Sequence, residues 1–175
     1  MSSFSCQSYV FDPRPDLSFL ITAKRYWQRS SPSLQDPTAL TLVFAHGNGF
    51  HKEQWEPTIE ELYNLPDIVI GKKKIREAWT IDAPNHGDAA ILNEIALEAH
   101  KSVCTCVLVC YLLLHQCHCM HTQNNRSCTL TLKVRWEEYA RCIHAFLSGL
   151  GTGVDVDFST RHIIGIGHSM GGTAL

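Results

Sequence analysis

Residues 161–172 read RHIIGIGHSMGG, an apolar run that leads directly into Gly167-His168-Ser169-Met170-Gly171. The run is typical of a buried strand, and the five residues at its end have the form G-x-S-x-G. A serine on a tight turn between a strand and a helix needs small neighbours, which explains the glycines two residues before and after it. The pattern predicts a nucleophile elbow that holds the Ser169 hydroxyl at a helix start, where negative charge is stabilised. The strand in front favours this elbow over a glycine-rich turn with an ordinary hydroxyl.

Two other apolar runs also end in polar, turn-forming loops. ALTLVFA at 39–45 is followed by His46-Gly47-Asn48-Gly49, and EAWTI at 77–81 is followed by DAPNHGD. Apolar strands that alternate with amphipathic helices are the pattern of an α/β protein. We predict a mostly parallel sheet with helices on both faces and an antiparallel hairpin at one edge. The predicted strands are residues 5–11, 17–27, 39–45, 77–81 and 161–166, and the predicted helices are residues 53–65 and 136–150.

The glycine-rich turn after residues 39–45 is a candidate oxyanion hole. In acyl transfer the tetrahedral oxyanion needs about two preorganised donors, and glycines let backbone N–H groups approach it. One donor would be the N–H of Asn48 or its neighbour, and the other would be the Met170 N–H just after the nucleophile. The alternative is a tight turn in which His46 has a structural role only. The elbow elsewhere in the chain favours the oxyanion interpretation.

Three stretches, taken in order, resemble a known family. HGNGFHKEQWEP, IDAPNHGDAA and GIGHSMGGTAL are similar to the N-terminal half of the α/β-hydrolase fold. DAPNHGDAA followed by WEEYARCIHAFL resembles fungal hydrolase-domain proteins of host-selective toxin biosynthesis, in pathways to epoxy-decatrienoic acid toxins, and peroxisomal lipase-like proteins. The resemblance covers residues 5–100 and 136–175.

The resemblance implies a serine hydrolase that acts on an ester or thioester of a lipid-like or polyketide-like acyl compound. Ser169 would be the nucleophile, the N–H groups of Asn48 and Met170 would form the oxyanion hole, and water would complete deacylation. This chemistry needs no metal and no organic cofactor, and its partner is a small acyl substrate. An acyltransferase uses the same acyl-enzyme and remains an alternative. The residues expected to support the pocket and its loops are His46, Gly47, Gly49, Asp82, His86, Gly167 and Gly171.

The catalytic triad of the resembled fold is expected to be incomplete. In that fold the acid and the histidine follow the nucleophile, and only six residues follow Ser169. A serine hydroxyl without a base is a weak nucleophile, and we do not expect His46, His51, His86 or His168 to replace the missing base. Residues 1–175 are therefore expected to be a partial domain, truncated after the elbow, with impaired catalysis. A non-catalytic remnant or binding module is the rival interpretation.

Residues 101–134 differ in composition from the rest of the chain. They hold six of the eight cysteines and no acidic residue. One interpretation is a translated intron within the family pattern. A second is a metal site built from Cys117, His118, Cys119 and His121, although their spacing lacks paired C-x2-C and H-x3-H ligands. A membrane helix is disfavoured, because the apolar part at 103–114 is shorter than the roughly 17–25 residues that span a bilayer.

Charge and termini limit the remaining functions. With 15 basic and 17 acidic residues, the chain has no surplus of positive charge to bind nucleic acid. The first residues lack a basic segment followed by an apolar one, so we expect no secretory signal. The resemblance implies a peroxisomal protein, but the chain ends Thr173-Ala174-Leu175 rather than in an S-K-L-type tripeptide, so the cytoplasm is the alternative. The sequence predicts no oligomeric state.

Overall fold

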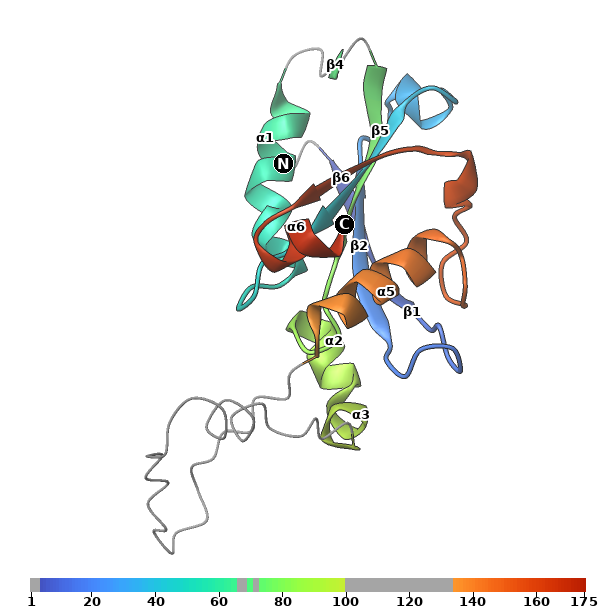
Figure 1. Cartoon of the computed structure of the whole chain (residues 1–175). Coiled ribbons are helices and arrows are strands. Elements are labelled where there is room, and N and C mark those ends of the chain that lie inside the picture. Colours follow the sequence, from blue (N-terminus) through green and yellow to red (C-terminus); the bar gives the residue numbers. More distant parts are fainter. Residues whose placement is uncertain (1–3, 66–68, 71–72, 100–133) are drawn as a thin grey trace, which may run out of the picture.

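The computed structural model describes residues 4–65, 69–70, 73–99 and 134–175. Its centre is a sheet with the strand order β1-β2-β5-β3-β6, and β4 pairs with β5 outside this order. Figure 1 shows the elements in the colours of the sequence. The strands are β1 (Ser5–Phe11), β2 (Ile21–Trp27), β3 (Leu40–Ala45), β4 (Val69–Ile70), β5 (Lys73–Ile81) and β6 (His162–Gly167).

The sheet combines a parallel centre with an antiparallel edge, as predicted. Strand β3 is parallel to both β5 and β6, whereas β1 and β2 form an antiparallel hairpin that joins β5 through β2. All six residues of β3 are buried, because helices cover both faces of the sheet at this strand. The carboxyl ends of β3, β5 and β6 therefore lie along one edge of the sheet, where ligands bind in folds of this class.

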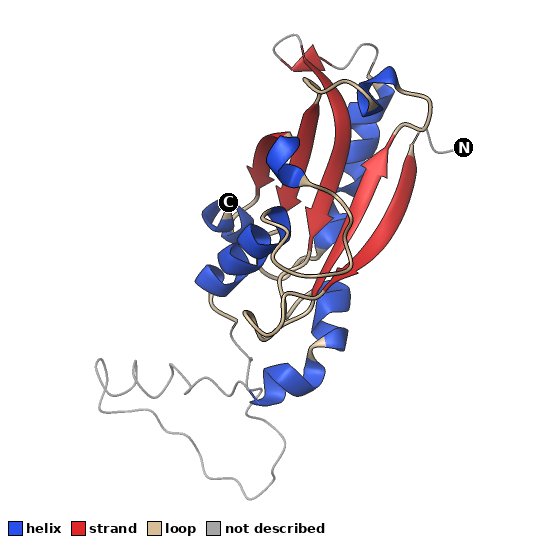
Figure 2. Cartoon of the chain, turned by 90° about the vertical axis from the view of Figure 1, so that its right-hand side faces the viewer, coloured by secondary structure: helices blue, strands red, loops and turns tan. Residues whose placement is uncertain are grey.

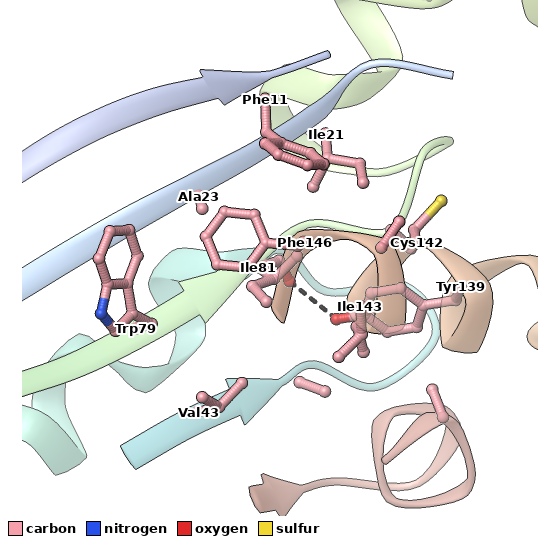
Figure 3. Packing of buried hydrophobic residues seen from close by; sticks show 14 of the residues in the cluster. Phe11, Ile21, Ala23, Val43, Trp79, Ile81, Tyr139, Cys142, Ile143 and Phe146 are labelled. Carbon is pink, nitrogen blue, oxygen red and sulfur yellow. Dashed lines mark hydrogen bonds between the residues drawn. The ribbon is translucent and has the colours of Figure 1, made fainter. Parts of the chain in front are cut away.

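Helices pack against both faces, which confirms the predicted layers (Figure 2). On one face Ile59 and Tyr63 of α1 (Glu56–Asn64) pack against strand residues such as Phe44. On the other face α5 (Trp136–Leu147) and α6 (Met170–Ala174) cover a larger apolar cluster. Figure 3 shows its centre, where the ring of Phe146 lies edge-on to Trp79 at 5.4 Å between centroids. Burial of such aromatic side chains is the main stabilising contribution of this layer.

Several element boundaries differ from the prediction for local reasons. The helix predicted at 53–65 is divided into a 3-10 turn η2 (Lys52–Trp55) and α1, because Pro57 has no N–H and is best accommodated in the first turn of an α-helix. Strand β5 begins at Lys73, four residues earlier than predicted, where it pairs with β4. Two short helices after β5 were not predicted: α2 (Gly87–Leu92) and α3 (Glu94–Ala99), which extend beyond the end of the sheet in Figure 1.

The unusual segment at 101–134 lies outside the described residues, except for Val134. The metal site, membrane helix and intron interpretations of that segment therefore remain predictions. Among the residues that are described, no helix is long and apolar enough to cross a membrane. In the same ranges, no group of three or more His, Cys, Asp or Glu side chains is placed to hold a metal ion.

The other 3-10 turns are η1 (Pro32–Leu34) and η3 (Phe158–Thr160).

Candidate active site

The backbone at Ser169 has an unusual conformation. Its φ of 51° and ψ of −116° make it the only described residue other than glycine with a positive φ. Such conformations are strained, and they persist where the surroundings impose them. A β-carbon on Gly167 would lie 2.4 Å from the Gly172 nitrogen, and one on Gly171 would lie 2.1 Å from the Ala45 carbonyl oxygen. Both glycines of the G-x-S-x-G pattern are therefore required by close backbone contacts, and Ser169 itself is exposed.

The elbow and the predicted oxyanion loop lie side by side. Ala45 at the end of β3 pairs in parallel register with Gly167 at the end of β6. The His168 N–H donates a hydrogen bond to the Ala45 carbonyl oxygen at 3.1 Å. A β-carbon on Gly47 would lie 2.5 Å from the His168 Nδ1 atom. Residues 46–51, which we call the 46–51 loop, are thus in contact with the elbow.

His46, at the start of this loop, has both ring nitrogens occupied. Its Nε2 accepts the Ala83 N–H at 2.9 Å, so the proton is on Nδ1, which donates to the Gly47 carbonyl oxygen at 2.9 Å. The side chain is fully buried, and this burial lowers its pKa. A neutral imidazole whose acceptor nitrogen is already engaged cannot take a proton from Ser169. In the described structure His46 therefore supports the loop.

His86 holds the middle of the same loop. Its Nε2 accepts the Gly49 N–H at 3.2 Å, and its Nδ1 donates to the Asn85 side-chain oxygen at 2.8 Å. Burial is the main effect on its pKa and lowers it, while nearby Asp82 opposes the shift. Gly49 has a φ of 82°, a conformation that glycine adopts without strain. His86 is thus a hydrogen-bond acceptor for the turn and, like His46, is not placed to act as a base.

These contacts distinguish the candidate oxyanion donors. The Gly49 N–H is already paired with His86, whereas no described residue accepts a hydrogen bond from the Asn48 N–H. Met170 is the first residue of α6, so its N–H has no acceptor within the helix. Asn48 and Met170 therefore each carry an N–H group that remains free for a ligand. Their role in catalysis stays a prediction.

No base for Ser169 is found in the described part of the chain. There, neither a histidine nor a carboxylate accepts a hydrogen bond from the Ser169 hydroxyl. The His168 ring lies edge-on to Phe50 at 6.0 Å between centroids, and the His51 Nδ1 lies 2.8 Å from a carboxylate oxygen of Glu53. The four histidines considered as possible bases for Ser169 are thus each in contact with another residue.

The structure adds two residues that the sequence did not indicate as part of the site. The Tyr139 hydroxyl on α5 donates to the Ile81 carbonyl oxygen at 2.7 Å and accepts the His46 N–H at 3.2 Å, so it joins the ends of β5 and β3 (Figure 3). Lys52, just after the 46–51 loop, has a buried ammonium group 2.9 Å from Asp82. No local pattern identifies either contact, because each partner is distant in sequence.

A groove beside the 46–51 loop offers space for a substrate. Its volume is about 570 Å³. It is lined by two loops and by helices α2 and α3, through Asn48, Gly49, Asn85, His86, Ala90, Glu94, Leu97 and Glu98. The groove lies next to the free Asn48 N–H and combines the apolar Ala90 and Leu97 with the carboxylates of Glu94 and Glu98.

Comparisons with known proteins bear on the family and the fold. A model of the alpha/beta hydrolase family matches residues 42–175. The peroxisomal membrane protein LPX1 of Saccharomyces cerevisiae is 36% identical over 84 residues, which are 46% of this chain and 19% of that protein. The solved structure of the peroxisomal alpha-beta-hydrolase Lpx1 from the same yeast matches with a TM-score of 0.55 and 23% identity, over 99% of this chain and 40% of that one. The structural match shows the shared fold, and this chain spans less than half of the length of Lpx1 in both comparisons.

Proposed function

The chain belongs to the alpha/beta hydrolase family, and on that premise we propose that it is a serine hydrolase with Ser169 as its nucleophile. The observation that carries the proposal is the strained, exposed Ser169 between two sterically required glycines, in contact with a loop that has a free N–H group. Strain of this kind is concentrated at functional sites. The α/β-hydrolase fold itself supports this reaction class.

The proposed reaction is acyl transfer to serine followed by hydrolysis. The Ser169 oxygen bonds to the acyl carbonyl carbon while its proton passes to solvent water, and the oxyanion accepts hydrogen bonds from the N–H groups of Asn48 and Met170. The alcohol or thiol then leaves with a proton, and water releases the acid and restores the serine. No metal or organic cofactor takes part in these steps. Because the described residues include no base for Ser169, we expect acylation to be slow in this chain.

The proposed substrate is an ester or thioester with a lipid-like or polyketide-like acyl group. The apolar side chains of Ala90 and Leu97 in the groove support this class, and Glu94 and Glu98 line the same groove. We further propose a peroxisomal location, supported by the similarity to the yeast protein Lpx1, which is described as peroxisomal, with the cytoplasm as the alternative. A role in host-selective toxin biosynthesis rests on the sequence resemblance alone and is proposed as the metabolic setting.

A fluorophosphonate probe tests the nucleophile. We expect the full chain to be labelled on the peptide that contains Ser169, and the S169A variant to lose this label. S148A is the matched control, because Ser148 is an exposed serine that caps the C-terminal end of α5 and is not part of the candidate site, so it should not affect labelling. Equal labelling of S169A and wild type would refute the assignment. A folded wild-type chain that is not labelled would favour the non-catalytic binding module instead.

A second measurement separates hydrolase from acyltransferase. The purified chain is supplied with a chromogenic thioester, with and without a primary alcohol. A hydrolase yields the free acid in both cases, whereas an acyltransferase yields the new ester when alcohol is present. S169A should abolish either product.

A further inference from the structure

Lys52 and Asp82 form an ion pair in the interior, next to the candidate oxyanion loop. The side chains of Lys52 and Asp82 are 1% and 0% exposed. The Lys52 ammonium lies 2.9 Å from one oxygen of Asp82, and the Lys52 backbone N–H donates to the other oxygen at 2.7 Å. The Thr22 hydroxyl donates to Asp82 at 2.8 Å and completes its set of donors. A buried carboxylate with three donors is well satisfied, so it holds Lys52 by both its backbone and its side chain.

Acidic groups keep Lys52 charged in this buried position. Burial alone would lower the pKa of its ammonium group, but hydrogen bonds to Asp82 and Asp88 outweigh burial and raise it. Asp88 lies 2.7 Å from the ammonium and Glu53 lies 3.1 Å from it, and the side chain of Asp88 is 66% exposed. Asp82 is thus the fully buried partner, and Asp88 connects the pair to solvent.

Three contacts hold the 46–51 loop and the adjacent Lys52 to one segment of the chain. His46 is held by the Ala83 N–H, Gly49 donates to His86, and Lys52 is bound by Asp82. All three partners belong to residues 82–86, the segment that follows β5. The free Asn48 N–H lies between the first two contacts, and the Lys52 ion pair fixes the end of the loop.

We propose that Lys52, through its ion pair with Asp82, is a positioning residue that holds the 46–51 loop so that the Asn48 N–H faces the acyl group on Ser169. This rests on the proposed function for its chemical consequence, but the loop geometry can be measured without it. A small displacement of an oxyanion donor has a large effect on rate, because a shift of about 1 Å costs on the order of 100-fold.

The test compares K52M with D88N in the full chain. K52M removes the charge and the donor, and D88N changes only the exposed partner, so it serves as the matched control. We expect K52M to lower the maximal rate of fluorophosphonate labelling by about 100-fold while the half-saturating probe concentration changes by less than about twofold. We expect hydrogen exchange of the peptide covering residues 47–51 to become about tenfold faster. D88N should stay within about twofold of wild type in both measurements, and K52R, which keeps the charge, should recover part of the labelling rate.

Folding is controlled with a second variant. K52M leaves Asp82 buried without its counter-charge, which destabilises the fold. If K52M shows no cooperative melt, the measurements are made on K52M/D82N, which removes both charges. The double variant should show the same slow labelling and fast exchange. Labelling and exchange like those of D88N would overturn the proposal. If wild type is not labelled at all, the proposed function fails, and exchange alone then decides: faster exchange in K52M supports the positioning role, and unchanged exchange refutes it.

Discussion

A β-carbon on Gly171 would lie 2.1 Å from the carbonyl oxygen of Ala45. Gly171 follows the candidate nucleophile by two residues, and Ala45 ends the central strand, so the start of α6 is packed directly on the backbone of β3. This close approach brings the elbow against the loop that begins at His46. The site therefore depends on backbone contacts as much as on side chains.

Replacing Gly171 with alanine should destabilise the protein through this contact. The added methyl group must displace the backbone of β3 or α6, and we expect a loss of about 1–3 kcal/mol or more in the free energy of unfolding. G172A is the control, because a β-carbon there would meet its nearest atom at 3.4 Å. Urea unfolding measures both variants. Similar stabilities for G171A and G172A would contradict the packing described.

Replacing Ser169 with glycine should stabilise the protein while removing the nucleophile. Relief of the strained φ is worth about 1–3 kcal/mol, and the greater freedom of glycine in the unfolded chain costs about 0.4–1 kcal/mol. We expect a net gain of about 1 kcal/mol in S169G. S169A removes the same hydroxyl but keeps the strain, so its stability should match wild type. Thermal melts compare the two, and equal melting temperatures would argue against a strained elbow.

Acid should destabilise the protein through His46 and His86. Burial lowers the pKa of both side chains below the value of about 6.5 that is usual for histidine in an unfolded chain. Just below that pH, the unfolded state therefore binds more protons than the folded state. The stability that depends on neutral histidine side chains is complete above that pH, and it is lost as the pH falls through the folded pKa values. We expect the free energy of unfolding to fall as the pH is lowered below about 6.5.

The H86N variant checks this origin of the pH dependence. Asparagine can accept the Gly49 N–H but does not titrate, so the slope of stability against pH should be smaller than in wild type. Urea unfolding at several pH values gives the slopes. An unchanged slope would show that His86 does not contribute.

Removing the Tyr139 hydroxyl should cost more than removing a comparable buried hydroxyl. Y139F leaves the Ile81 carbonyl and the His46 N–H without their partner, and each unsatisfied buried group costs about 1–3 kcal/mol. Tyr63 is the control, since its hydroxyl makes one hydrogen bond, to the Tyr26 carbonyl oxygen at 3.0 Å. We expect Y139F to lose at least about 2 kcal/mol and Y63F about 1 kcal/mol. The opposite order in chemical unfolding would contradict the bridging role.

Cys142 should resist alkylation in the folded chain. It is 1% exposed on the buried side of α5, and burial raises the pKa of its thiol to about 12. Thiolates are the reactive form, so iodoacetamide at pH 8 should modify Cys6, which is exposed, and leave Cys142 free. Peptide mass spectrometry reads the two residues separately. Full modification of both before denaturant is added would show that α5 is not packed as described.

Much of the fold could be predicted from short stretches of sequence. The apolar run before His46 predicted the fully buried strand β3. The run before Gly167 predicted β6, but this strand lies at the edge of the sheet and is largely exposed rather than buried. The spacing of Tyr139, Cys142 and Phe146 indicated the buried face of α5. These signals are local, because strand burial and helix faces follow from the period of apolar residues. Boundaries were less accurate, as at Pro57, where a helix start competes with the preceding 3-10 turn. The short helices α2 and α3 were missed because turn-forming residues precede them.

The candidate site, like the fold, could be predicted from the sequence only in part. The sequence by itself determined the elbow and the glycine-rich turn, because glycine is needed wherever backbones meet or φ is positive, and such positions leave a local pattern. Only the tertiary structure decided that His46 and His86 are engaged as acceptors, that Gly49 is not a free donor, and that Lys52 is paired with Asp82. These contacts join residues about 30 to 40 positions apart, and their existence depends on the parallel register of β3, β5 and β6. Register is set by the packing of the whole sheet, so no single stretch of sequence encodes it.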